Sequence, residues 1–312
     1  MTNTAHLTIP ATTLDVYPLC LGGNVFGWSA NESQSQLVLD AFGALGGNFI
    51  DTADVYSDWG DGNVGGESET IIGNWIKARG NRHQFVIATK VAKLQTRPGL
   101  RPENVIAACN DSLKRLQTDH IDIYYSHHDD KDVPIAETLG AYQTLINEGK
   151  IRYIGASQHT GARLQEALDI SEKESLPKYI CLQNQYNLME RNPFESEQQQ
   201  VLKDNAISIL PYLGLARGFL TGKYRPGITV DSVRASGVTD YQNEKGYAVV
   251  DALTQIADSH NSSISAVALA WLRANPQVST PIASARTVEQ LEELMQVINL
   301  TNEEVALLNK IS

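Results

Sequence analysis

The chain of 312 residues has few cysteines, no long apolar run and no excess of positive charge. Its three cysteines, Cys20, Cys109 and Cys181, form no C-x-x-C pair, so neither a disulfide framework nor a zinc knuckle is expected. Apolar neighbours favour a small buried side chain at each of them. No stretch approaches the roughly 20 apolar residues that span a bilayer, so no membrane partner is expected. The polar segment Met1–Ala11 lacks the apolar centre of a signal peptide, which predicts a cytoplasmic protein.

The chain contains 25 Lys and Arg residues and 36 Asp and Glu residues, which gives a formal net charge of -11 at pH 7. An acidic surface repels nucleic acid, and no stripe of Lys or Arg is present, so no nucleic-acid partner is expected. The hydrophobic fraction of 42% and the charged fraction of 20% are those of a globular protein, which excludes a disordered chain.

Short apolar runs alternate along the chain with longer segments of helical spacing, as in a parallel sheet with helices between its strands. The predicted strands are Tyr17–Gly22, Asn48–Asp51, Phe85–Lys90, Ile121–Ser126, Ile151–Ala156, Tyr179–Gln183, Ile207–Pro211 and Thr280–Ala283. The predicted helices between them are Ser33–Leu45, Glu67–Ala78, Arg101–Leu116, Ile135–Glu148, Gly161–Ser171 and Phe194–Asp204. Pro102, Thr160 and Gly149 supply start and stop signals for three of these helices.

Eight such units in one chain predict a (β/α)₈ TIM barrel that forms a single domain over residues 1–312. A long segment from Leu213 to about Lys245 follows the seventh strand and is interpreted as a functional loop. Thr301–Ile311 is predicted to be a further surface helix at the C-terminal end, capped by Thr301.

A Rossmann fold is the main structural alternative, because Gly60–Gly65 matches the spacing G-x-G-x-x-G. That motif needs its first glycine to leave a strand directly. Here the predicted strand ends near Asp51, and Thr52–Trp59 has no strand pattern, so the segment is interpreted as a flexible loop before the helix that begins at Glu67.

Ionisable side chains stand at the ends of three predicted strands. Asp51 ends the second strand and is followed by Tyr56, Lys90 ends the third, and His127 follows the fourth. In an α/β barrel the carboxyl ends of the strands share one rim. A carboxylate, a phenol, an ammonium and an imidazole are therefore expected to converge at one mouth.

These four residues belong to stretches in which the sequence resembles the aldo-keto reductase superfamily. The resemblance covers nearly the whole chain, from about Leu14 to the last helix. The stretches that carry the resemblance are Asn48–Tyr56, Gly66–Glu69, Ile87–Lys90, Ile121–Tyr124 leading to His127, Gly149–Gly155 and Leu220–Tyr224. The resemblance implies an oxidoreductase that reduces aldehydes or ketones with a nicotinamide cofactor.

The resemblance also implies roles for the four residues at the mouth. Tyr56 would be the general acid that protonates the carbonyl oxygen, and the base in the reverse direction. A free phenol has a pKa near 10, and the Lys90 ammonium is expected to lower it. Asp51 would hold Lys90 charged and oriented. His127 would donate a hydrogen bond to the carbonyl oxygen.

The cofactor contacts implied by the resemblance fall on the later strand ends. The nicotinamide carboxamide is assigned to Ser157, Gln158 and Gln183, and Tyr212 would stack on the ring. The residues implied to cover the pyrophosphate are Leu213, Leu215, Arg217, Gly218 and Lys223. Arg217 and Lys223 also fit the alternative of solvated surface charges.

Ser284 and Arg286 precede a predicted helix that carries Gln290 and Glu293. A helix N-terminus binds phosphate, and Arg286 can clamp a 2′-phosphate. This pattern favours NADP(H) over NAD(H). Relatives often have Gly at the position of Ser284 and Asn at that of Leu294.

The run from His127 to Asp130 raises the alternative of a metal hydrolase. Adjacent residues on an extended chain point opposite ways, so His127 and His128 do not readily bind one ion, and His159 is the only further histidine nearby. No metal is therefore expected, and His128 is interpreted as a residue of the pocket rim.

Trp28 and Trp59, with Tyr125, are candidates for an apolar wall of the substrate pocket, although scaffold packing explains the tryptophans equally well. The expected partner is a small-molecule carbonyl compound or alcohol. The alternative function is a non-catalytic regulatory subunit that binds the nicotinamide nucleotide on the same scaffold. The sequence leaves the substrate, the preferred direction and the oligomeric state open.

Overall fold

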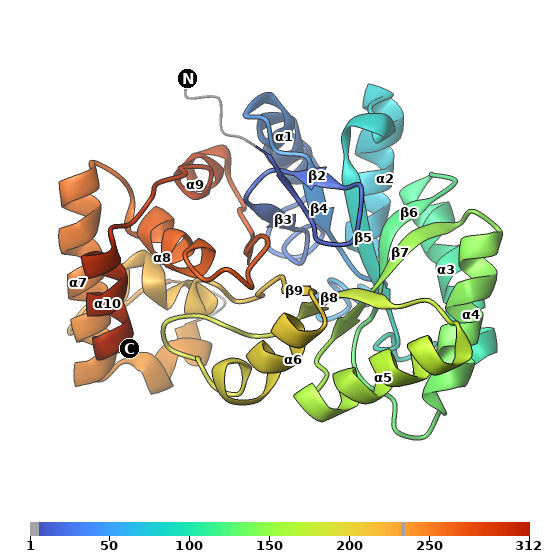
Figure 1. The fold of residues 1–312 in the computed structure, drawn as a ribbon. Coiled ribbons are helices and arrows are strands. Elements are labelled where there is room, and N and C mark those ends of the chain that lie inside the picture. Colours follow the sequence, from blue (N-terminus) through green and yellow to red (C-terminus); the bar gives the residue numbers. More distant parts are fainter. Residues whose placement is uncertain (1–5, 232–234) are drawn as a thin grey trace.

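The computed structural model describes residues 6–231 and 235–312 (Figure 1). The first five residues of the polar segment Met1–Ala11 and residues 232–234 of the predicted long loop lie outside the described residues. A parallel sheet of eight strands occupies the centre in the order β10-β3-β4-β5-β6-β7-β8-β9. Its strands are β3 (Cys20–Gly22), β4 (Phe49–Asp51), β5 (Val86–Val91), β6 (Ile121–Ser126), β7 (Ile151–Ser157), β8 (Tyr179–Gln183), β9 (Ser208–Ile209) and β10 (Ile282–Ala283).

Hydrogen bonds also join the two ends of this strand order. The N–H of Ser279 donates to the carbonyl of Ile209 at 3.1 Å, and the N–H of Ile282 donates to the carbonyl of Pro211 at 2.9 Å. The segment that leads into β10 thus pairs with β9 and the residues that follow it. The sheet closes on itself, which confirms the predicted (β/α)₈ barrel.

Helices surround the barrel, with α2, α3, α4 and α5 on one side and α7 and α10 packed side by side on the other (Figure 1). The helices are α1 (Glu32–Ala44), α2 (Glu67–Arg79), α3 (Pro102–Leu116), α4 (Ile135–Asn147), α5 (Gly161–Glu174), α6 (Gln199–Asp204), α7 (Glu244–His260), α8 (Ile264–Arg273), α9 (Val288–Leu294) and α10 (Asn302–Ile311). None of the helices in the described part of the chain is long and apolar enough to cross a membrane.

The boundaries agree closely with the sequence where capping residues mark them. The side chain of Thr160 accepts from the N–H of Arg163, and Thr301 forms a capping box with Glu304. Pro102 is the first residue of α3, as predicted. The prediction of one helix over Phe194–Asp204 is wrong in detail. That segment is a π-helical turn, η2 (Phe194–Gln198), followed by α6.

Helices α7 and α8 are absent from the sequence prediction. Eight of the ten residues of α8 are buried, so it shows no polar stripe of the kind that marks a surface helix. The long loop after β9 is confirmed, and its described part contains two short 3₁₀ helices, η3 (Ala216–Thr221) and η4 (Ala235–Tyr241). Helix α7 begins where the predicted loop ends.

A short antiparallel hairpin, β1 (Leu7–Thr8) and β2 (Asp15–Val16), lies at the end of the barrel where the strands begin. Its buried residues Ile9, Leu14 and Val16 pack in the same cluster as the barrel interior, which contains Cys20, Phe49, Val86, Ala88, Ile123, Tyr125, Ile180, Cys181, Leu210 and Ile282. The hairpin therefore closes this end. All three cysteines are free and buried, as predicted.

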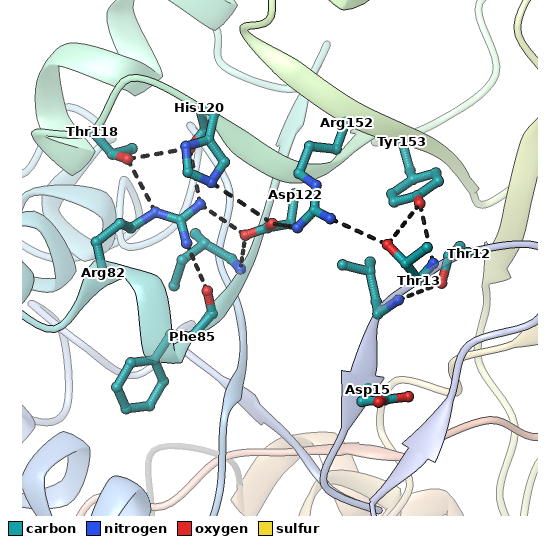
Figure 2. A network of polar contacts seen from close by, with 12 residues as sticks. Thr12, Thr13, Asp15, Arg82, Phe85, Thr118, His120, Asp122, Arg152 and Tyr153 are labelled. Carbon is teal, nitrogen blue, oxygen red and sulfur yellow. Dashed lines mark hydrogen bonds and ion pairs between the residues drawn. The ribbon is translucent and has the colours of Figure 1, made fainter.

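Beside the hairpin, the Asp122 carboxylate on β6 is the centre of a polar network (Figure 2). Asp122 accepts hydrogen bonds from Arg82 at 2.7 Å, from Arg152 at 2.8 Å and from the N–H of Ile87 at 2.9 Å. Its side chain is 2% exposed. Arg152 continues to Thr13 at 3.3 Å, so the network links β5, β6 and β7 to the hairpin.

Replacing Asp122 by Ala is expected to lower the free energy of unfolding by about 3 kcal/mol, because two guanidinium groups and one buried N–H lose their acceptor. Denaturation in urea measures the change. Asp119→Ala is the matched control, since the Asp119 side chain is 94% exposed. A loss from Asp122→Ala no larger than that of the control contradicts a stabilising role for the network.

Candidate active site

Four polar side chains meet at the rim opposite the hairpin. Asp51 is the last residue of β4, Lys90 is next to last in β5, and His127 directly follows β6. Parallel pairing in register brings these strand ends to the same level. Tyr56 joins them from a turn after β4 in which its N–H donates to the carbonyl of Ala53 at 3.1 Å.

The Lys90 side chain is fully buried at the centre of this group. Its Nζ donates to Asp51 Oδ2 at 2.6 Å, to the carbonyl of Thr52 at 2.7 Å and to Tyr56 Oη at 2.8 Å. These three contacts use every proton of an ammonium group. Burial lowers the pKa of Lys90, and the Asp51 carboxylate opposes that effect. Asp51 thus holds the amine charged and aimed at the phenol.

Tyr56 Oη accepts from Lys90 and also donates to Asp51 Oδ2 at 3.2 Å. Burial, and next the Asp51 carboxylate, hold the pKa of Tyr56 well above its ordinary value. The pKa is therefore raised, contrary to the lowering that was expected from Lys90, because burial and the Asp51 carboxylate have the largest effects. Tyr56 carries its proton at neutral pH, as a proton donor must.

His127 faces Tyr56 with their ring centroids 5.9 Å apart and nearly edge-on. Burial, and then the charges of Lys90, Lys93 and His128, hold the pKa of His127 well below its ordinary value. The ring is therefore neutral and carries one N–H. Its Nδ1 atom is buried and has no hydrogen-bond partner within the described residues. His127 and Tyr56 line the same cavity, so the ring can contact a ligand placed against Tyr56.

Two adjoining cavities extend from this group along the rim, with about 780 Å³ and 1000 Å³ of empty space. Asp51, Tyr56 and His127 line the first cavity, and Arg286 lines the second. The residues shared by both are Leu215, Arg217 and Ser284. The result is one groove that fits an elongated ligand such as a dinucleotide.

The residues assigned to the nicotinamide end line the first cavity together. They are Ser157, Gln158, Gln183 and Tyr212. Gln183 Nε2 donates to Asp51 Oδ1 at 2.8 Å, and Ser157 Oγ donates to the carbonyl of Gln183 at 2.8 Å. Gln183 therefore also orients Asp51, which the sequence did not reveal. Asn184 Oδ1 accepts from the N–H of Gln158 at 2.6 Å and fixes a residue with a positive φ of 55°.

The loop after β9 forms one wall of the groove, with Leu213 and Leu215 as lining residues. Asn187 Nδ2 donates to the carbonyl of Leu213 at 2.9 Å and anchors the start of the loop. Arg217 lines both cavities, and its Nη1 donates to the carbonyl of Gly237 at 3.1 Å. Gly218 lies outside the lining, with a positive φ of 93° that gives the turn its shape.

The far end of the groove is lined by the predicted cofactor residues Arg286, Gln290 and Glu293, by Lys223, which was assigned to the pyrophosphate, and by Leu294. No ion pair involves Lys223 or Arg286 within the part of the chain that the structure describes. Ser284 Oγ donates to Asn24 Oδ1 at 2.6 Å, and Asn24 is a lining residue that sequence reasoning missed.

The candidates for the substrate wall are only partly brought together, and neither Trp28 nor Trp59 lines the two cavities of the groove. The rings of Trp28 and Trp59 are 5.8 Å apart in an edge-on arrangement, and Trp59 is 6.1 Å from Tyr56. Tyr125 is fully buried in the barrel interior and takes no part in the wall. His128 Nδ1 donates to the carbonyl of Asp129 at 2.6 Å, and His128 does not line the groove.

The histidines near the rim are engaged separately. His159 Nδ1 lies 2.8 Å from the carbonyl of Ser157, and His128 bonds to Asp129. Within residues 6–231 and 235–312, no group of three or more His, Cys, Asp or Glu side chains is arranged to hold a metal ion.

The chain is similar to known proteins over nearly its whole length. The model of the Aldo/keto reductase family matches residues 18–312. "Protein tas" of Escherichia coli is 32% identical over 320 residues, covering 94% of this chain and 92% of that protein. "Uncharacterized oxidoreductase YrpG" of Bacillus subtilis is 34% identical over 313 residues, covering 96% and 93%.

Another relative of similar coverage is named as a channel subunit and not as an oxidoreductase. "Probable voltage-gated potassium channel subunit beta" of Arabidopsis thaliana is 30% identical over 299 residues, covering 92% of this chain and 89% of that protein. The family match spans the barrel and every lining residue of the groove. The resemblance noted in the sequence is thereby confirmed, and the chain belongs to the aldo/keto reductase family.

Proposed function

We propose that the protein is an NADPH-dependent oxidoreductase that reduces the carbonyl group of aldehydes or ketones to an alcohol, reversibly. The contact between Lys90 Nζ and Tyr56 Oη at 2.8 Å, at the head of a groove, carries this proposal. It pairs a phenol that holds its proton with a buried ammonium that stabilises the phenolate left behind.

When bound, a reduced nicotinamide supplies a hydride to the carbonyl carbon. Tyr56 Oη gives its proton to the carbonyl oxygen, so that an alcohol forms and a phenolate remains. Lys90 stabilises the phenolate, and Asp51 keeps Lys90 in place. His127, a neutral ring, donates a hydrogen bond to the carbonyl oxygen and favours the charge that builds there. In the reverse direction the phenolate removes the proton of the alcohol.

The groove has the residues to hold the two ends of such a cofactor. Ser157, Gln158 and Gln183 offer hydroxyl and amide groups to the carboxamide, and Tyr212 offers a ring face. Arg286, at the other end, offers a planar group with several donors to a 2′-phosphate. This last contact favours NADPH over NADH.

Replacing Arg286 by Leu is expected to raise the Kd for NADPH by about 10- to 100-fold, the effect of losing hydrogen bonds to a charged phosphate. The Kd for NADH, which has no 2′-phosphate, changes less than about threefold. Quenching of tryptophan fluorescence during titration measures both constants. Arg101→Leu, on an exposed residue before α3, is the control. Equal weakening of both nucleotides contradicts a contact with the 2′-phosphate.

The proposed function is tested by titration with NADPH and NADH, followed by a panel of aldehydes and ketones in which the absorbance of NADPH is followed. Loss of NADPH that depends on both enzyme and carbonyl compound supports the proposal. Absence of nicotinamide nucleotide binding contradicts it.

A regulatory subunit that binds the nucleotide without turnover is the second candidate, because relatives of similar coverage are named potassium channel subunits. The same panel separates the two functions. Tight binding of NADPH with no turnover of any carbonyl compound favours the regulatory subunit.

A further inference from the structure

The glycine-rich segment Gly60–Gly65 has a structural role other than dinucleotide binding. It lies between β4 and α2 as two consecutive turns, in which the N–H of Gly60 donates to the carbonyl of Ser57 and the N–H of Asn63 donates to the carbonyl of Gly60, each at 3.0 Å. No strand leads into it. The turns bring the side chain of Asn63 back over the start of the segment.

The Asn63 amide joins this segment to the loop after β3. Its Nδ2 donates to the carbonyl of Ser57 at 2.7 Å and to the carbonyl of Gly27, on the other loop, at 2.9 Å. Both amide protons are therefore used. A Cβ atom at Gly60 would lie 2.6 Å from Asn63 Nδ2, so a side chain there would displace the amide.

Ser57 makes the second connection between the loops. It is fully buried, and its Oγ donates to the carbonyl of Phe26 at 2.7 Å. We call Ser57 and Asn63 together the mouth clasp. Each of its side chains bonds to the backbone of the loop after β3, at adjacent residues Phe26 and Gly27.

Each of the joined loops carries one tryptophan. Trp28 follows Gly27 directly, and Trp59 lies inside the segment that the mouth clasp holds. The two rings are 5.8 Å apart at 89°, and Trp59 also lies 6.1 Å from the ring of Tyr56. Trp59 is 47% exposed, and its ring packs edge-on against Trp28 of the other loop.

We propose that Asn63 is a positioning residue for substrate preference. By holding the two loops together it keeps the Trp28 and Trp59 rings beside Tyr56, and this aromatic wall selects flat aromatic carbonyl compounds over small aliphatic ones. The inference rests on the proposed function, since it concerns which carbonyl compounds reach Tyr56. Asn63 contacts neither substrate nor cofactor and acts through the tryptophans.

Asn63→Ala removes both donors, and Asn63→Asp places a carboxylate against two carbonyl oxygens. We expect the ratio of kcat/KM for 2-naphthaldehyde to that for propanal to fall about tenfold in Asn63→Ala and further in Asn63→Asp. The loss falls mainly on the KM for 2-naphthaldehyde, while kcat/KM for propanal and the Kd for NADPH change less than about twofold. Ser57→Ala is expected to act in the same direction.

A second readout is independent of turnover. Of the four tryptophans, Trp75 and Trp271 are 1% and 4% exposed, so quenching of fluorescence by acrylamide reports on Trp28 and Trp59. In Asn63→Ala the quenching constant is expected to rise about twofold as the contact between the rings loosens. Asp61→Ala, at an exposed position of the same segment, is the control for both readouts.

A wild-type protein that turns over neither aldehyde contradicts the proposed function, and quenching then tests the mouth clasp alone. Increased quenching together with a lowered substrate ratio supports the inference. An unchanged substrate ratio overturns it whatever the quenching shows, and unchanged quenching overturns the positioning of the tryptophans by Asn63.

Discussion

Replacing Tyr56 by phenylalanine is expected to lower kcat/KM for carbonyl reduction by about 10³-fold, within the range attributed to a general acid. The substitution removes the hydroxyl that lies 2.8 Å from Lys90 Nζ and keeps the ring that packs beside Trp59. Because the pKa of Tyr56 is held well above its ordinary value, wild type carries this proton throughout the neutral range. Among the described residues, Tyr212 is the other tyrosine that lines the cavity at the head of the groove.

Steady-state rates with a reactive aldehyde measure the loss, and titration with NADPH shows whether the groove is intact. The Kd for NADPH is expected to change less than about threefold, because no cofactor contact is removed. Tyr153→Phe is the matched control, since the Tyr153 hydroxyl bonds to Thr13 beside the hairpin, at the opposite end of the barrel. A Tyr56→Phe variant that keeps wild-type turnover contradicts the role of Tyr56 as proton donor.

Asp54→Asn is expected to stabilise the protein at alkaline pH relative to wild type. The Asp54 side chain is 1% exposed, and neither of its carboxyl oxygens has a hydrogen-bond partner within the described residues. Burial, and next the Glu69 carboxylate, raise the pKa of Asp54 to about 8, while Arg115 and Lys90 oppose the rise. The nearby Arg115 is engaged by the other carboxyl group, since its Nε donates to Glu69 Oε2 at 2.6 Å.

The direction of the pH dependence of stability follows from the number of protons that the folded and unfolded states bind. An unfolded aspartate has a pKa near 3.9, so between about pH 4 and pH 8 the folded state holds a proton that the unfolded state releases. Wild type therefore loses stability as the pH rises through this window, and an asparagine at position 54 does not. The difference in the free energy of unfolding between Asp54→Asn and wild type is expected to grow by about 3 kcal/mol between pH 5 and pH 8.

Urea denaturation at pH 5 and at pH 8 measures that growth. Asp61→Asn, on an exposed aspartate of the neighbouring segment, is the control. A constant difference between Asp54→Asn and wild type across the two pH values contradicts a protonated carboxyl group at position 54.

Much of the barrel could be predicted from the sequence, because the patterns that mark strands and helix ends lie in neighbouring residues of the chain. The strands Ile121–Ser126 and Tyr179–Gln183 have the predicted bounds, and Thr160 and Thr301 cap the helices that they were expected to cap. Elements whose signal depends on their surroundings were missed. Helix α8 is buried on nearly all sides, and the hairpin formed by β1 and β2 is ordered by the barrel end that it covers.

The same division applies to the site. Residue types in a fixed order were enough to indicate that Asp51, Tyr56, Lys90 and His127 share one rim. The contact that orients Asp51 could not be predicted, because the hydrogen bond from Gln183 to Asp51 joins residues 132 positions apart. The substrate wall required the structure for the same reason, since Asn63 bridges 36 positions to Gly27.

The sequence by itself indicated the closed barrel and the four polar residues at its mouth, because strand periodicity and the order of strand ends are properties of the chain alone. The family followed from the resemblance of its motifs, which the family match confirms. The tertiary structure decided how these residues ionise. Burial and Asp51 raise the pKa of Tyr56, and burial, with Glu69, raises the pKa of Asp54 to about 8. Desolvation depends on everything packed around a group, so it exists only once the chain has folded.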